Sequence, residues 1–131
     1  MSYITISDIT GFVPGPFLNN ALDDSEPQND PPQADPTVLN KVLQDASNAV
    51  DKIIGTKFST PFSNPLPAAV HNAARWFAIE LIYQRRGKAD ANPYAKHAED
   101  ARTHLAAIAA GTMPLNPSRS AAKSTAAPAA K

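Results

Sequence analysis

Three segments of the sequence begin with an Asp-Pro or Asn-Pro pair and end at or near a glycine. A short side chain with an oxygen atom caps the first turn of a helix, proline is tolerated in that turn, and glycine is common just past the last turn. The pairs and glycines predict helices over about residues 36–54, 65–86 and 93–110. The predicted fold is therefore all-α, a small bundle of three main helices.

The central segment, residues 65–86, holds the only tryptophan and the densest run of large apolar side chains. Its apolar residues recur at three- and four-residue steps, which places them on one helical face. That face is formed by Leu66, Val70, Ala73, Ala74, Phe77 and Leu81, and it is widened by Trp76, Ile79, Ile82 and Tyr83. A face this wide predicts that the helix packs on more than one side and that a partner outside the domain covers part of it.

The two flanking helices each show a single apolar stripe. In residues 36–54 the stripe alternates with an outward face of amides and charges, and in residues 93–110 it contains many alanines that permit a close neighbour. Between the first two helices, Phe58 and Phe62 are expected to anchor an extended connector. The apolar stripes consist of Val38, Leu39, Val42, Leu43, Ala46, Ala49, Val50, Ile53 and Ile54, and of Tyr94, Ala98, Ala101, Leu105, Ile108 and Ala109.

The regions outside the bundle differ in composition. Residues 1–22 predict short helical turns, with Thr5 or Ser7 as a cap. The apolar side chains expected to fold back on the core are Phe12, Val13, Phe17, Leu18 and Leu22. Residues 23–36 are acidic and rich in proline, which predicts a long loop. Residues 116–131 are a low-complexity basic tail. The predicted organisation is one helical domain, residues 1–115, followed by an extended tail, residues 116–131.

The formal net charge is zero, but the charges are unevenly distributed. Residues 1–51 contain eight acidic side chains and one basic side chain, Lys41, whereas the remainder contains eleven basic and four acidic ones. Copies of such a chain can associate acidic face to basic face, and a core of this size gains from oligomerisation or docking. Solvated surfaces are the plainer interpretation of any single charge. The candidates for contacts between subunits are Asp45, Asp51, Arg75, Trp76, Arg85 and Arg86.

No arrangement typical of catalysis or of a bound cofactor occurs in the sequence. There is no cysteine, and the one metal set worth testing, His97, Asp100 and His104, lies opposite the apolar stripe, where a polar face produces such triplets by chance. The acidic loop lacks the glycine and the glutamate of an EF-hand calcium loop. There is no glycine-rich phosphate loop and no nucleophile elbow. We therefore expect neither an enzyme nor a metal or cofactor site.

A small helical DNA-binding or regulatory protein remains an alternative. Basic residues cluster around Arg85 and Arg86, and the tail adds three more cations. Cations in the last turn of a helix also complement the helix dipole, which is the plainer interpretation of the cluster. No aromatic residues are interleaved with these cations, so sequence-specific binding is not supported.

No membrane or export segment is expected. The N-terminal residues lack the basic flank and apolar run of a signal peptide. The longest purely apolar run, residues 105–110, is much shorter than a membrane span.

Several segments together resemble a known family. The opening Tyr3-Ile4-Thr5, the segments VLNKVLQDASNAVDKIIG and KFSTPF, and then NPLPAAVHNAARWFAIELIYQRRG and AEDARTHLAAIAAG, follow in the order found in head-tail connector proteins of Mu-like phages and prophages. These resemble the small helical adaptor proteins below the portal of long-tailed phages. The resemblance covers about residues 3–115 and does not extend to the loop at 23–36 or to the tail.

The resemblance implies a structural protein of the virion, assembled in the host cytoplasm and located in the neck between head and tail. Copies would form a ring, expected to be a dodecamer, docked on the portal protein and offering its other surface to a stopper or tail-completion protein. Double-stranded DNA would pass through the ring without specific recognition. The tail is expected to reach the portal, with Arg119, Lys123 and Lys131 as contact candidates.

Overall fold

A computed structural model describes residues 2–25, 27, 29, 31–58, 60, 62, 66–85, 87 and 89–113. Within these residues the chain is all-α and contains no strand. The helices are α1 (Gly15–Leu22), α2 (Pro36–Ile54), α3 (Ala68–Gln84) and α4 (Ala95–Ala110), with short 3-10 turns at Ile6–Asp8 and Ala89–Ala91. The expected all-α bundle is confirmed, and it includes one more helix than the three main ones predicted.

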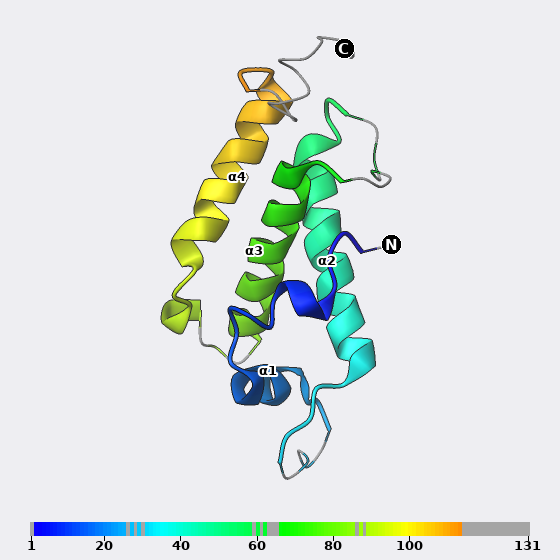
Figure 1. The fold of residues 1–131 in the computed structure, drawn as a ribbon, viewed down its shortest axis with the longest axis vertical. Coiled ribbons are helices and arrows are strands. Elements are labelled where there is room, and N and C mark those ends of the chain that lie inside the picture. The colour runs from blue at the N-terminus through cyan, green and yellow to red at the C-terminus, as the bar shows by residue number, and fades with distance from the viewer. Residues whose placement is uncertain are drawn as a thin grey trace.

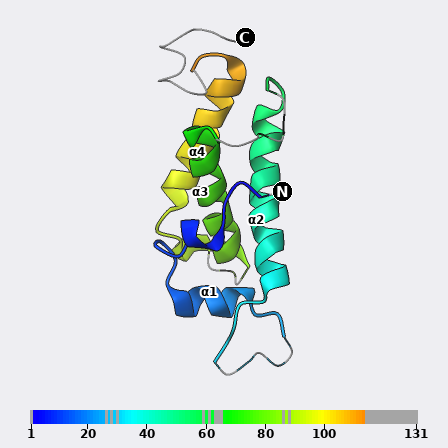
Figure 2. The same ribbon diagram turned by 45° about the vertical axis from the view of Figure 1, so that its right-hand side comes forward.

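The three long helices run side by side, and α1 crosses one end of the bundle (Figures 1 and 2). α3 contacts each of the other three helices, and α2 also contacts α4. The N-terminal segment, dark blue in Figure 1, lies across the bundle next to α2 and α3. The central position of α3 explains why it buries side chains on more than one face, as its wide apolar face predicts.

The ends of α2 match the prediction, whereas both later helices begin further along the chain. Asp35 caps α2 by accepting a hydrogen bond from the Thr37 backbone N–H at 2.9 Å. α3 begins at Ala68 rather than at residue 65, because Pro67 disfavours helical backbone at the residue before it and itself has an extended ψ of 140°. Asn64 and Pro65 lie outside the described residues. α3 ends at Gln84 rather than at residue 86.

α4 begins at Ala95 instead of Pro93 because Asn92 closes a turn ahead of the helix. Its side-chain oxygen accepts a hydrogen bond from the Tyr94 backbone N–H at 2.9 Å. The predicted end of α4 is confirmed, since Gly111 follows the last turn with a φ of 86°, a left-handed conformation that glycine adopts at little cost.

α1 is a complete helix where the sequence predicted short turns. Leu18, Ala21 and Leu22 are buried, and the Phe17 ring stacks on Tyr83 of α3 with ring centroids 4.5 Å apart. Arg85, just after α3, donates hydrogen bonds to the Ala21 carbonyl at 2.9 Å and to the Asp24 carboxylate at 2.5 Å. These contacts close one end of the bundle over the core.

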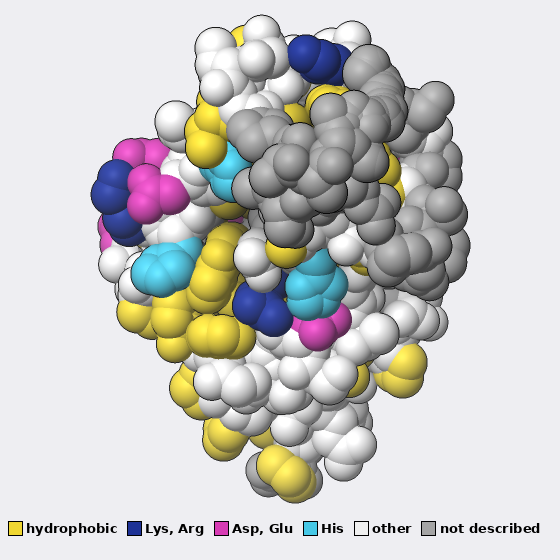
Figure 3. Space-filling model, turned by 45° about the horizontal axis from the view of Figure 1, so that its top comes forward, with side chains coloured by type: hydrophobic (Ala, Val, Ile, Leu, Met, Phe, Trp, Pro, Cys, Tyr) yellow, Lys and Arg dark blue, Asp and Glu magenta, His cyan; other side chains and the backbone are white. Residues whose placement is uncertain are grey.

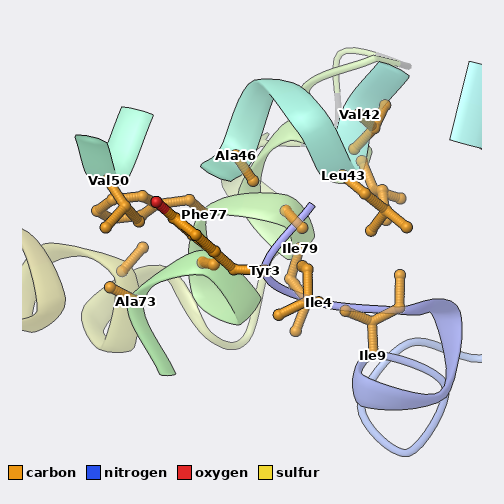
Figure 4. Close-up of a cluster of buried hydrophobic side chains, with 14 of the residues drawn as sticks. Tyr3, Ile4, Ile9, Val42, Leu43, Ala46, Val50, Ala73, Phe77 and Ile79 are labelled. Atoms are coloured by element: carbon orange, nitrogen blue, oxygen red, sulfur yellow. The ribbon is translucent and has the colours of Figure 1, made fainter. Parts of the chain in front are cut away.

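The N-terminal segment contributes directly to the core (Figure 4). Tyr3, Ile4 and Ile9 are all less than a tenth exposed and belong to one cluster of buried side chains with α2 and α3. The partners labelled in Figure 4 are Val42, Leu43, Ala46 and Val50 of α2 and Ala73, Phe77 and Ile79 of α3. The folding back that the sequence predicts from residue 12 onward therefore begins earlier, at the third residue of the chain.

Tyr3 also fixes this segment by hydrogen bonds to two other parts of the chain. Its hydroxyl donates to the Asp51 carboxylate at 2.5 Å and accepts from the Phe62 backbone N–H at 3.0 Å, while its own backbone N–H donates to the Ser47 hydroxyl at 2.9 Å. Burial, followed by the hydrogen bond to Asp51, raises the pKa of Tyr3 to about 12. One side chain thus joins the N-terminus, α2 and the connector to α3.

The acidic loop after α1 is organised around the carboxylate of Asp23. That side chain is buried, at 2% exposure, and accepts hydrogen bonds from the backbone N–H groups of Ser25, Asn29 and Gln33 and from the side chains of Ser25 and Asn29. The Ser25 hydroxyl, followed by the Gln33 backbone N–H, holds the pKa of Asp23 well below its usual range. The described residues of the loop are therefore held by donors that converge on a single anion.

Replacing Asp23 with asparagine should lower the urea midpoint of unfolding at pH 7, because an amide cannot accept all of these hydrogen bonds. Since the folded pKa is lowered, the stability that Asp23 contributes is present above the unfolded value of about 3.9 and is lost as the pH falls from about 4 toward the folded pKa. Unfolding in urea across this acidic range, for wild type and Asp23→Asn, measures the difference. Asp90→Asn, at an exposed position, is the matched control. Equal midpoints for the two variants at every pH would contradict the assignment.

Candidate interaction surface

Four aromatic side chains from three parts of the chain meet at the surface. Phe12 follows the first 3-10 turn, Trp76 belongs to α3, and Tyr94 and His97 lie at the start of α4. The Trp76 ring centroid is 5.1 Å from that of Phe12, 5.6 Å from that of Tyr94 and 4.6 Å from that of His97. We call these four residues the aromatic patch. Each is at least partly exposed, and Figure 3 shows hydrophobic side chains gathered beside histidine and basic side chains on one face of the molecule.

Arg75 borders the aromatic patch. Its guanidinium carbon lies 5.2 Å from the Phe12 ring centroid and 5.9 Å from that of Trp76, within the range of a cation–π interaction. Its Nε atom is buried and has no hydrogen-bond partner, and Arg75 forms no ion pair with any residue that the structure describes. The patch therefore has a cation at its edge whose hydrogen-bonding capacity is unused within the described chain.

A contact between a histidine and a carboxylate lies on the same side of α3. His71, one turn before Arg75, has its Nε2 atom 3.3 Å from the Asp8 carboxylate. Burial works to raise the pKa of Asp8, but hydrogen bonding from the Thr5 backbone N–H, together with His71 and Arg75, holds it below its usual range. The pair ties the first 3-10 turn to α3 and so supports the position of Phe12.

The position of this surface follows from the way α3 packs. Ala73, Ala74, Phe77 and Ala78 are buried in the bundle, so the two residues between the pairs, Arg75 and Trp76, come to lie at its border. The turn that Asn92 closes before α4 then brings Tyr94 beside Trp76. The turn at Asn92 and the exposed border of α3 together form the aromatic patch.

Comparison with known proteins decides the family of this chain. A family model described as Bacteriophage Mu, Gp36 matches residues 3–131. The chain belongs to this family. The resemblance to proteins of Mu-like phages is thereby confirmed at the level of the family, and the chain is a phage protein. Searches of curated proteins and of solved structures returned no significant match.

Two of the predicted contact residues of this Gp36-family chain, Arg75 and Trp76, are brought together at the aromatic patch. Three others take partners within the chain: Asp45 pairs with Lys41 at 3.0 Å, Asp51 accepts from Tyr3, and Arg85 pairs with Asp24. Arg86 and the tail residues Arg119, Lys123 and Lys131 lie outside the described residues, as does the predicted boundary after residue 115. Contacts between subunits at these positions stay predictions.

The sequence placed His97 on the polar face of its helix, but it did not single out Phe12 or Tyr94 as surface residues. Phe12 was expected in the core, and Tyr94 was assigned to the apolar side of its helix. Periodicity carries no signal for such a patch, because its members come from three elements whose meeting is set by tertiary packing. The one available clue was the excess width of the apolar face around Trp76.

The structure does not bring His97, Asp100 and His104 of the Gp36-family chain together as one group. The His97 ring packs on Trp76, and Asp100 pairs with Lys96 at 2.9 Å. Over the part of the chain that the structure describes, no three His, Asp or Glu side chains come together as metal ligands would.

A search of the same residues for a helix long and apolar enough to cross a bilayer finds none.

Proposed function

We propose that this chain is a structural, non-enzymatic protein of the virion, a head-tail connector that docks as a ring on the portal vertex and joins the DNA-filled head to the tail. The observation that carries the proposal is the match to the Gp36 family over residues 3–131, in a chain whose ordered motifs resemble head-tail connectors of Mu-like phages. DNA would pass through the ring, and the expected number of copies is twelve.

Physical features of the domain support such a role. The aromatic patch and Arg75 offer a surface with unused binding capacity, since tryptophan, tyrosine and arginine are the residues that most often dominate the energetics of protein interfaces. The bundle is also small, and small domains bury less of their surface on folding than large ones do. Contacts with sister copies and with a portal protein would cover the aromatic patch and Arg75 and would bury more of the surface of this small domain.

The neighbours we propose are a portal protein on one side of the ring and a stopper or tail-completion protein on the other. The basic tail, with Arg119, Lys123 and Lys131, is the candidate segment for the portal. The described core residues all precede Gly111, so a truncation after residue 115 leaves each of them in the chain.

A phage that carries an early stop codon in the gene for this chain should produce DNA-filled heads and free tails that do not join. Electron microscopy of the lysate measures the fraction of joined particles, and a plaque assay measures infectivity. Supplying the wild-type chain in trans should restore both. Tailed, infectious particles in the absence of the chain would rule out the connector role.

A chain truncated after residue 115, supplied in the same experiment, tests the tail alone. We expect it to fold but to be lost from purified heads, because the portal contact is missing. Retention of the truncated chain on heads would refute the tail as the portal contact and would leave the connector role standing.

The alternative, a small helical DNA-binding or regulatory protein, has less support than the sequence offered it. Arg85, which belongs to the basic cluster, is engaged by Asp24 and by the Ala21 carbonyl. A gel-shift assay with duplex DNA at physiological salt separates the two functions, since the connector requires only non-specific proximity to DNA.

A further inference from the structure

We infer that Arg75 and the aromatic patch of one copy bind the outer face of α2 on a second copy, with Asp45 as the acceptor for Arg75. The inference rests on the proposed ring and deepens it by naming the contact between neighbouring copies. It begins from Arg75, a cation held on two aromatic rings with no hydrogen bond and no ion pair among the described residues.

The chemistry of this surface fits a carboxylate better than a nucleic acid. A guanidinium binds a carboxylate through paired N–H donors, and the rings beside it can pack on the aliphatic part of the approaching side chain. A DNA backbone would need several cations together, but Lys96, near the patch on α4, is taken by Asp100, and Asp8 lies close enough to Arg75 to feel its charge. Among the described residues this surface therefore offers one unpaired cation, which is too few to hold a polyanion.

The acid-rich part of this chain, residues 1–51, supplies a candidate for the acidic partner. Residues 1–51 carry most of the acidic side chains, and the structure describes six of them. Five have roles within their own copy: Asp8 pairs with His71, Asp23 orders its loop, Asp24 pairs with Arg85, Asp35 caps α2, and Asp51 accepts from Tyr3.

Among the described residues, the sixth, Asp45, pairs with Lys41 alone, one turn before it on the same helix. The Lys41 side chain is 74% exposed and that of Asp45 is 47% exposed, and an exposed pair of this kind contributes little. Exchange of Lys41 for a partly desolvated arginine on a neighbouring copy would thus cost little and would satisfy both groups.

The two surfaces are different parts of the molecule, so the contact is head to tail. Such contacts repeat from copy to copy and close into a ring when the rotation between copies allows it. The zero net charge of the chain removes long-range repulsion between copies. The same pairing within one copy does not occur, since Arg75 and Asp45 each lack it in the structure.

A charge exchange tests the inference on the full-length chain by sedimentation velocity. Arg75→Asp and Asp45→Arg should each weaken self-association by roughly 30-fold or more, the loss typical of a central interface arginine, and the double variant should regain most of it. Lys57→Asp is the matched control, because Lys57 lies against Gly111 at the end of α4 that is remote from Tyr94. It should associate as the wild type does.

Circular dichroism establishes that each variant is folded, and the neutral pair Arg75→Gln and Asp45→Asn replaces any variant that is not. A wild-type chain that is monomeric at roughly 1 mM, single variants that associate normally, or a double variant that recovers nothing would each overturn the inference. So would loss of duplex DNA binding by Arg75→Asp with self-association intact. Tailless heads from the stop-codon phage together with normal association of Arg75→Asp would refute this contact alone.

Discussion

Phe77→Ala should lower the free energy of unfolding by about 3–5 kcal/mol, whereas Trp76→Ala, one residue earlier, should lower it by only about 1–2 kcal/mol. Phe77 is 2% exposed within the core, and Arg102 of α4 lies over its ring at 4.9 Å, so truncation leaves a cavity between helices. Trp76 packs against the edge of the core and on the other rings of the aromatic patch, and it keeps part of its surface in water. Since small domains have a total stability of about 5–15 kcal/mol, the first change removes a large part of it.

Urea unfolding followed by circular dichroism measures both variants, because Trp76→Ala removes the only tryptophan and hence the fluorescence probe. Trp76→Ala should instead impair self-association, since it removes the centre of the aromatic patch. A Trp76→Ala chain as unstable as Phe77→Ala would show that the patch belongs to the core and is not a surface for a partner.

Tyr3→Phe should lower the free energy of unfolding by about 1–3 kcal/mol at pH 7, because it removes a hydrogen bond to a charged acceptor and leaves the Phe62 N–H without its partner. The folded pKa of about 12 lies above the ordinary value of 10.0, so the contribution of the neutral hydroxyl is complete below pH 10. It is lost as the pH rises from about 10 to about 12. Between these pH values the wild type should therefore lose stability that Tyr3→Phe, which has no hydroxyl at this position, does not lose.

Tyr94→Phe is the matched control, since it removes a hydroxyl for which the described chain shows no hydrogen bond. Urea unfolding of wild type and both variants at pH 7 and at alkaline pH gives the comparison. If Tyr3→Phe were no less stable than Tyr94→Phe at pH 7, the bond to Asp51 would contribute nothing to the fold.

The start or end of a helix could be predicted from the sequence wherever a single residue determines it. Asp35 and Pro36 place the start of α2, and Gly111 ends α4, because capping and left-handed backbone are properties of those residues themselves. The starts of α3 and α4 were misplaced because more than one residue competed for each: two prolines before α3, and a turn closed by Asn92 before α4.

The candidate interaction surface could be predicted only in part from the sequence. Arg75 and Trp76 stood out by charge and size, but the aromatic residues that join them come from separate elements. Charge alone also proposed Asp51 and Arg85 as contacts between copies, although both have partners within the chain. The sequence gives the number of charged groups but does not show which of them already have partners within the chain.

The amino-acid order was sufficient for the helical class, the apolar stripes and the family, because these depend on propensity, periodicity and motifs that lie along a single stretch of chain. Only the folded chain settled that Phe77 is core and Trp76 is partly exposed at its border, that Asp23 organises its loop, and that Tyr3 bonds a carboxylate 48 residues away. Burial and long-range hydrogen bonds depend on which elements meet in space, and spacing within one element does not contain that information.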